Sequence, residues 1–510
     1  MLIEALIALC LVGAAVVFLA PNRFAHKLAV GFSLPPLVIS LYMYFAFDGS
    51  GNALLGGDIA YETFTQWLQL GSYTVNYHMG LDGISLPLVV LSTILTTLAI
   101  LSAWTPIDER QSQFYGLMLF LEASLIGVFG ALDFLLWFVF WEAVLIPMYF
   151  LIGIWGGPRR KYAAIKFFVY TNIASIVMFI GYFALVFGLG DSVSSTGLPE
   201  IAQALRAGQL GSLGIIGPDA LALGAFVAMF LGFAVKVPVV PFHTWLPDAH
   251  VEAPTPASVM LAGVLLKMGT YALLRFNFTM LPGQAEILAI PIAVIAVISI
   301  IYGALLALAQ SDLKRIVAYS SVSSMGYVIL GLIAYTVYGV GGATFQMVAH
   351  GLISGLLFMT VGVIYNTTHT RMVGDMAGMA EKMPVTAGVF VAGAFAYMGL
   401  PLMAGFAAEL FIFLGAFEST VLPYAPLFTA VAMFGIVIVA GYLLWAMQRS
   451  LFGPFRLETD YEIGPAALHD VVPLVTLVLL IILLGSAPMV FFESIQDATL
   501  DIVATLGGGI

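Results

Sequence analysis

Long apolar stretches dominate this sequence and limit the folds that it can adopt. About fourteen stretches of roughly 20 residues are apolar enough to cross a bilayer. Their centres lie near positions 10, 37, 91, 120, 145, 177, 230, 265, 297, 327, 354, 400, 437 and 481. Only 9% of the residues are charged, against about a quarter in a soluble domain. The sequence therefore predicts an all-α polytopic membrane protein with about 14 transmembrane helices.

Basic residues indicate how these segments cross the membrane. When the loops are numbered alternately, one side collects most of the 17 Lys and Arg residues: Arg23, Lys27, Arg110, Arg159, Arg160, Lys161, Lys166, Lys314, Arg315, Arg371, Lys382, Arg449 and Arg456. The other side collects Arg206 and Arg275, while Lys236 and Lys267 fall inside spans. Basic loops face the cytoplasm or matrix, so both termini are predicted on the opposite side. Glu4 stands where a cleaved signal would be basic, so the first span is predicted to be retained.

Several classes of function are excluded by what the sequence lacks. Cys10 is the single cysteine, whereas an iron–sulfur cluster usually needs four cysteine ligands. Glycine-rich nucleotide-binding loops and the HExxH metal motif are missing from the sequence. A net charge of -11 argues against nucleic acid as a partner. Nucleotide or redox chemistry, if it is coupled to this protein, takes place on other chains.

The seventh and twelfth spans resemble each other. AVKVPVVPFHTWLP and AYMGLPLMAGFAAEL are both apolar segments interrupted by proline and small residues, and each has one ionisable group near the break. They lie five spans apart, so the second unit enters the membrane in the opposite sense. Inverted repeats with paired broken helices are typical of ion transporters. We therefore divide the chain into spans one to three (1–110), a first five-helix repeat (111–276), an inverted second repeat (282–450), and a last span with a short tail (451–510).

Five ionisable residues lie deep in the predicted spans: Glu142, Lys236, Lys267, His350 and Glu409. A charge at the centre of a membrane helix costs roughly 2.5–3.5 kcal/mol on insertion scales. That cost falls when the group pairs, becomes neutral or meets water. Burial disfavours the charged form of such a group and a nearby opposite charge favours it, so its protonation can be tuned. The set predicts a proton relay, with Lys236 beside the first break as its most informative member.

Other polar residues are secondary candidates for the same relay: Glu122, His243, His250 and Ser324. His243 and His250 lie with Asp248 and Glu252 after the first break, where they could bind a metal or make capping and loop contacts. Ser320, Ser321, Ser323 and Ser324 could give the tenth span a wet face or let helices pack closely. A structural reading of the buried charges, in which Glu–Lys pairs only lock helices together, also stays open.

Four stretches resemble the antiporter-like membrane subunits of NADH:quinone oxidoreductase, respiratory complex I. They are VKVPVVPFHTWLPDAHVEAPTPASVMLAGVLLKMG, FVFWEAVLIPMYFLIG, SDLKRIVAYSSVSSMGY and GLPLMAGFAAEL. The superfamily is shared with multisubunit sodium/proton antiporters. Within it, L-type, N-type and D-type subunits typically have lysine in the twelfth span, whereas the M-type branch has glutamate. Glu409 and the short tail after the last span make this sequence similar to the M-type branch, with the D-type as alternative.

The resemblance implies a role for each matching residue. Glu142 and Lys236 correspond to an input pair, Lys267 to a central relay lysine, His350 to a further relay group and Glu409 to the exit-side group. Relatives often have histidine in the tenth span where this chain has Ser324. A hydroxyl cannot hold a proton as imidazole does, so a relay that passes there is expected to need a bridging water.

The resemblance also implies the assembly in which the chain works. NADH oxidation, FMN, the iron–sulfur clusters and the quinone site are expected on other subunits, with none of these cofactors and no metal on this chain. Expected partners are the L-type and N-type neighbours and lipids. A bacterial plasma membrane is expected, with the mitochondrial inner membrane as alternative.

Three hypotheses of function follow from this reading. The first is a proton-translocating subunit of a respiratory enzyme without redox chemistry of its own. The second is exchange of sodium for protons by a D-type antiporter subunit. The third is a membrane scaffold whose buried charges lock helices together.

Overall fold

The computed structural model describes residues 1–461, 463–464 and 466–506. Within this part of the chain, thirteen helices are long and apolar enough to span a membrane. Two shorter apolar helices, α18 (Pro384–Tyr397) and α19 (Ala404–Phe417), follow one another in the predicted twelfth span and make the fourteenth crossing. The predicted all-α membrane fold with about fourteen crossings is confirmed.

The other long helices follow the predicted spans in order. In the first half they are α1 (Leu2–Leu19), α2 (Asn22–Phe45), α3 (Ser85–Ser102), α4 (Gln111–Gly130), α5 (Phe134–Ala143) with α6 (Leu145–Trp155), α7 (Arg160–Leu189), α9 (Pro218–Lys236), and the composite α11 (Thr255–Met260), η3 (Leu261–Leu265), α12 (Leu266–Ala272) and η4 (Leu273–Thr279). In the second half they are α14 (Ala289–Leu308), α15 (Leu313–Ile333), α16 (Val337–Thr368), α20 (Ala425–Ser450) and α21 (Leu468–Ser486).

Shorter elements fill the connections between these helices. They are η1 (Gly190–Ser192), α8 (Leu198–Arg206), η2 (Phe242–Trp245), α10 (Leu246–Glu252), α13 (Pro282–Ile287), η5 (Val373–Asp375), α17 (Met379–Lys382), α22 (Pro488–Val503), η6 (Ala504–Leu506) and the strands β1 (Ala60–Leu70), β2 (Tyr73–Leu81), β3 (Met376–Ala377) and β4 (Arg456–Leu457). The helix α22 lies in the predicted short tail and begins two residues after α21 ends.

Both predicted breaks are present. Helix α9 ends at Lys236, and η2 and α10 continue the segment after Pro238 and Pro241. Proline lacks the N–H that an inner helical position needs, so two prolines within five residues end α9. In the twelfth span α18 ends at Tyr397, and Gly399 takes a left-handed φ of +69° before α19 begins.

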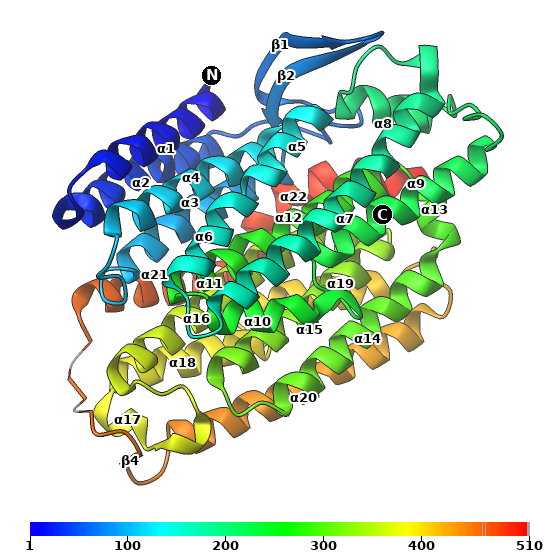
Figure 1. Ribbon diagram of the computed structural model, residues 1–510. Coiled ribbons are helices and arrows are strands. Elements are labelled where there is room, and N and C mark those ends of the chain that lie inside the picture. The colour runs from blue at the N-terminus through cyan, green and yellow to red at the C-terminus, as the bar shows by residue number, and fades with distance from the viewer. Residues whose placement is uncertain (462, 465, 507–510) are drawn as a thin grey trace.

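The bundle has two distinct ends (Figure 1). At one, which we call the hairpin end, the antiparallel strands β1 and β2 extend near α8. At the other, which we call the basic end, lie α17, which ends at Lys382, and β4, which begins at Arg456, with Arg371 in the loop before η5. The hairpin was not predicted, because its sequence lies in what was read as a loop between the second and third spans.

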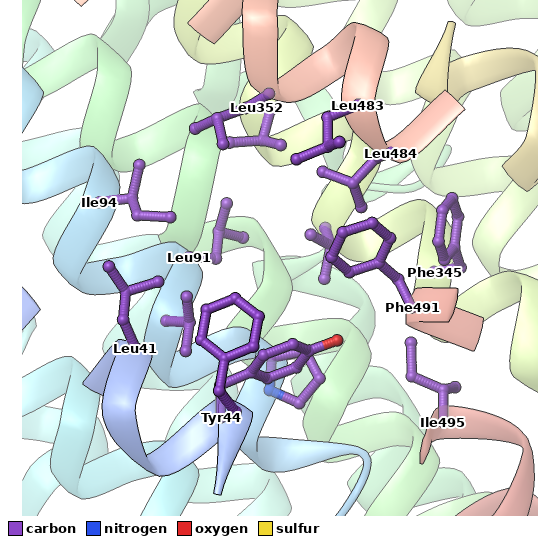
Figure 2. Close-up of a pocket in the computed structure, with 15 residues that line it drawn as sticks. Leu41, Tyr44, Leu91, Ile94, Phe345, Leu352, Leu483, Leu484, Phe491 and Ile495 are labelled. Atoms are coloured by element: carbon purple, nitrogen blue, oxygen red, sulfur yellow. The ribbon is translucent and has the colours of Figure 1, made fainter. Parts of the chain in front are cut away.

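The long helix α16 forms the centre of the bundle and is buried along most of its length. It packs against α15, α18, α19, α21 and α22, and also against α3, α11 and η3. Figure 2 shows an apolar cavity of about 140 Å³ beside it, lined by residues that include Leu91, Phe345 and Phe491. Among the described residues that line this cavity none is an acid, a lysine, an arginine or a histidine, and Tyr44 is the one tyrosine among them.

Candidate functional site

Lys236 is held at the first break by an aromatic ring. Its side chain is 2% exposed, and among the described residues its Nζ has no hydrogen-bond partner. Nζ lies 4.8 Å from the centroid of the Trp141 ring. Such a contact is worth about 2 kcal/mol or more when it is desolvated. The stacked Trp141 therefore offsets part of the cost of burying the ammonium group.

Glu142 follows Trp141 in the chain but does not bond to Lys236. Its Oε2 accepts a hydrogen bond of 3.1 Å from Asn172 Nδ2, while Oε1 is buried with no partner in the described part of the chain. Glu142 and Lys236, which were expected as an input pair, therefore make no direct hydrogen bond with each other: Glu142 bonds to Asn172, and Lys236 contacts the Trp141 ring. Their joint role stays a prediction.

Lys267 and His350 are joined directly. Lys267 is fully buried; its Nζ donates to the carbonyl of Ala262 at 2.6 Å and lies 2.5 Å from Nδ1 of His350. The lysine sits in α12 between the π-helical turns η3 and η4. A π-turn spaces hydrogen bonds five residues apart and is frequent at functional sites. Ala262, in η3, lies five residues before Lys267.

Tyr397 extends this contact across the second break. His350 Nε2 lies 3.1 Å from the Tyr397 hydroxyl, which also accepts a hydrogen bond of 2.9 Å from Ser324 Oγ. Tyr397 was not predicted as a site residue. The one signal for it is its position as the last residue of α18, at the break. Tyr397 thus connects Ser324 with His350, and the expectation that a relay at Ser324 needs a bridging water stays a prediction.

Glu409 lies beyond Tyr397 on α19. Its side chain is 6% exposed, and its Oε2 has no hydrogen-bond partner within the part of the chain that is described. A small cavity is lined by Glu409, Tyr397, His350 and Ser324. The structure therefore brings together Lys267, His350, Ser324 and Glu409, four of the residues named from the sequence.

The two lysines belong to helices that touch. A Cβ placed on Gly269 of α12 would meet Val237 N at 3.0 Å and Lys236 C at 3.2 Å. This glycine lets the end of α9 approach α12 closely. Lys236 and Lys267 nevertheless make no hydrogen bond with each other, since Nζ of Lys236 has no partner among the described residues.

A polar cavity of about 390 Å³ lies at the basic end. Its walls include Glu252, Lys314, His369 and Arg371. Lys314 is 6% exposed and its Nζ donates to the carbonyl of Ala253. The cavity brings charged and polar groups to the helices on which the relay residues lie, because Thr255 of α11 and Gly362 of α16 also line it.

The two histidines after the first break make no hydrogen bond with Lys267 or His350 in the described part of the chain, although His250 lies close enough to interact electrostatically with both. His250 is fully buried against Phe358, with ring centroids 4.5 Å apart, and neither ring nitrogen has a partner among the described residues. His243 packs edge-on against Tyr302. Their acidic neighbours are engaged elsewhere: Asp248 pairs with Lys166 at 2.7 Å, and Glu252 accepts from the backbone of Arg159 at 2.8 Å. Within the described ranges no group of three or more His, Cys, Asp or Glu could hold a metal ion.

Glu122 and three of the four serines make none of these hydrogen bonds. Glu122, on α4, is fully buried beside Cys10 of α1, and neither carboxylate oxygen has a hydrogen-bond partner in the described chain. Ser320 and Ser321 donate to the carbonyl of Val317, and Ser323 donates to that of Ile300. These three serines donate to backbone groups and support close packing of α15. Ser320 and Ser321 also lie beside the Tyr397 hydroxyl, but Ser324 is the serine that donates a hydrogen bond to it in the described part of the chain.

A buried ion pair near the hairpin end corrects the placement of Arg275. The sequence placed Arg275 in a loop, but it lies in η4, is 1% exposed, and donates from Nη2 to Asp82 Oδ1 at 2.5 Å. Burial would raise the pKa of the Asp82 carboxyl, but the Arg275 charge and backbone N–H donors more than offset this, so the pKa is lowered. The signal that sequence reading missed is Asp82, at the end of β2 and just before α3.

The same ion pair connects to the C-terminal helix. Asn52 Oδ1 accepts a hydrogen bond of 3.4 Å from Arg275 Nη1. Asn52 Nδ2 donates to the carbonyl of Ala498 in α22. Asp497 and Asp501 of α22 accept from the backbone N–H groups of Gly51 and Asn52. The predicted short tail is therefore fastened to the loop that precedes the hairpin.

Comparisons with known proteins show which chains this one is similar to. The family model described as "NADH:quinone oxidoreductase/Mrp antiporter, TM" matches residues 131–438, and that described as "NADH-ubiquinone oxidoreductase chain 4, amino terminus" matches residues 59–128. The F(420)H(2) dehydrogenase subunit M of Methanosarcina mazei is 38% identical over 99% of this chain and 98% of its own length. The NADH-quinone oxidoreductase subunit M of Rhodobacter capsulatus is 38% identical over 95% of this chain and 91% of its own. A chain in the structure of respiratory complex I from Thermus thermophilus with bound NADH superposes with a TM-score of 0.86 at 27% identity, covering 100% of both chains.

Proposed function

Because the chain belongs to the NADH:quinone oxidoreductase/Mrp antiporter transmembrane family, we propose that it is the M-type, proton-translocating membrane subunit of an NADH:quinone oxidoreductase. The observation that supports this most is the buried row Lys267–His350–Tyr397–Ser324 beside Glu409. Titratable and hydroxyl groups in hydrogen-bond contact inside a membrane are what a proton relay needs. The relatives named as oxidoreductase subunits favour this function over a sodium/proton antiporter.

The chain forms part of an enzyme complex whose redox chemistry we assign to other subunits. A single cysteine supports this assignment, since iron–sulfur clusters need several thiolates. FMN, the clusters and the quinone site then belong to partner chains. The F(420)H(2) dehydrogenase subunit M aligns over 99% of this chain and 98% of its own length, which supports an electron donor that is determined by other subunits. We propose NADH as that donor.

In the proposed path protons enter at the basic end and leave at the hairpin end. They reach Lys236 and Lys267 from the side of the polar cavity, pass His350, and leave through Glu409. The basic end then faces the cytoplasm, and both termini lie on the other side of a bacterial plasma membrane. L-type and N-type subunits are the proposed neighbours, with lipids covering the remaining apolar surface.

Replacing Lys236 by alanine tests the entry half of this path. We expect NADH-driven proton uptake and NADH oxidation in inverted membrane vesicles to fall together, by about tenfold or more, because the group that accepts the proton is lost. Assembly is checked on a native gel. Lys382→Ala, which removes an exposed lysine paired with Glu381, is the matched control and is expected to leave both rates unchanged.

Wild-type proton uptake by assembled Lys236→Ala complex would show that this lysine is structural. Two further measurements separate the alternative functions. A D-type antiporter subunit predicts sodium-dependent proton exchange without any response to NADH. A scaffold predicts that Glu409→Gln loses assembly but keeps full transport in each complex that does assemble, whereas a relay predicts assembled complex that does not pump.

A further inference from the structure

The Tyr397 hydroxyl lies beside four polar side chains, those of His350, Ser324, Ser320 and Ser321. Ser324 Oγ donates to the tyrosine oxygen at 2.9 Å, and His350 Nε2 lies 3.1 Å from it. When Lys267 is protonated, its ammonium can only donate to Nδ1 of His350, and the ring proton is then on Nε2 and points to Tyr397. The tyrosine oxygen thus accepts twice. Its own hydrogen can then be donated to a further acceptor, which is either a water or the neighbouring Ser320 or Ser321.

A small cavity lies where that hydrogen can point. It measures about 10 Å³, and its walls include Ser324, Gln346, His350, Tyr397 and Glu409. Gln346 Oε1 and Glu409 Oε2 are both buried acceptors with no partner in the described chain. A water molecule needs roughly 10–15 Å³ of this space and two to four polar partners. One donor and two acceptors around a space of this size match a single water.

We propose that Tyr397 is a proton-transfer residue that passes a proton from His350 to Glu409 through one water held by Tyr397, Gln346 and Glu409. The inference rests on the proposed function, because it needs a relay that passes through His350. It adds to that relay Tyr397, which was not expected from the sequence, and it places a water in the cavity that Ser324 also lines. It also makes the break between α18 and α19 the point at which the path changes helices.

The transfer balances without leaving a charge on Tyr397. Lys267 gives a proton to His350 Nδ1, and Nε2 gives its proton to the tyrosine oxygen. The hydroxyl proton of Tyr397 goes to the water, and a water proton goes to the Glu409 carboxylate. Lys267 ends neutral and Glu409 ends protonated, while Tyr397 and the water each keep the number of protons with which they began. His350 stays neutral but changes tautomer, so it must reset before the next transfer.

Tyr397→Phe in the full complex tests the proposal. The ring stays and only the hydroxyl is lost, so we expect assembly on a native gel, with proton uptake and donor oxidation lowered by about tenfold or more. Tyr335→Phe is the matched control. Tyr335 is also fully buried, and its hydroxyl donates to the carbonyl of Phe278 at 2.7 Å, so this variant loses a comparable bond outside the row and is expected to pump normally.

Gln346→Leu provides the second variant. It removes an acceptor from the water site and leaves Tyr397 in place. We expect it to lower proton uptake, as Tyr397→Phe does. If Tyr397→Phe does not assemble, full activity of assembled Gln346→Leu overturns the proposal. Wild-type proton uptake by assembled Tyr397→Phe overturns it as well.

Lys267→Ala, measured alongside, distinguishes a failure of the whole relay from a failure of the path through Tyr397. If Lys267→Ala stops pumping and Tyr397→Phe does not, the relay stands and the path through Tyr397 is wrong. If Lys267→Ala also pumps normally, the proposed function itself fails.

Discussion

Replacing Lys267 by arginine is expected to stop proton translocation while the complex still assembles. Arginine keeps the positive charge of Lys267 and can still donate hydrogen bonds to the Ala262 carbonyl and to His350. Its guanidinium group cannot be deprotonated in proteins, so it cannot release a proton to His350. In inverted vesicles, donor oxidation and proton uptake should fall together by about a hundredfold, within the range by which positioned proton-transfer groups act.

The same variant distinguishes a relay from a structural lock. A lock needs only charge and donors, so it predicts that Lys267→Arg works as well as lysine does. Lys267→Met, which keeps the length but removes charge and donors, should fail under both readings and only reports on assembly. Lys166→Arg serves as control, because Lys166 pairs with Asp248 outside the row. Normal pumping by Lys267→Arg would remove proton release by Lys267 from the mechanism.

The predictable part of this fold comes from local physical rules. Apolar runs of membrane length located all fourteen crossings, and paired prolines or a glycine–proline break located both interruptions. Lys267, His350 and Glu409 were found because an ionisable side chain deep in an apolar run has a cost that must be offset. These arguments need only the neighbours of each residue in the chain.

The contacts that the sequence did not reveal join distant residues. Tyr397 reaches His350 across 47 positions and Ser324 across 73, and nothing in the hydropathy of α18 separates this tyrosine from any other apolar aromatic. The π-turns beside Lys267 carry no distinct sequence pattern, since η3 is as apolar as the neighbouring α-helix while η4 contains Arg275, Asn277 and Thr279, so periodicity does not identify them. Trp141, rather than Glu142, contacts Lys236 because two residues adjacent on α5 point in different directions.

Arg275 was misplaced for a related reason. An arginine near the end of a predicted span is normally assigned to the adjoining loop, since an unpaired charge is costly in the membrane. Its partner, Asp82, lies 193 positions away and is fully buried. Only the folded structure shows that Asp82 compensates the Arg275 charge. The loop before the hairpin contacts this pair through Asn52, which also bonds to α22.

Replacing Asp82 by asparagine is therefore expected to destabilise the chain strongly. Asparagine keeps the shape but leaves the buried Arg275 charge without a counter-charge, and breaking a buried pair in this way costs roughly 3–5 kcal/mol. The lowered pKa of Asp82 means that its stabilisation is fully present above the ordinary carboxyl value of 3.8. It is lost only as the pH falls through the still lower value in the folded chain. We expect Asp82→Asn complex to lose its subunits at a lower temperature on native gels at neutral pH.

Two companion variants decide whether the charge pair is responsible. Asp58→Asn removes an exposed carboxylate from the loop before β1 and is expected to change stability by less than about 0.5 kcal/mol. The double variant Asp82→Leu with Arg275→Met replaces both charges by apolar groups, and such replacements are often neutral, so it should recover much of the lost stability. If the double variant is as unstable as Asp82→Asn, the backbone hydrogen bonds that Asp82 accepts from Ala53, Ile84 and Ser85, rather than its charge, hold this end of the bundle together.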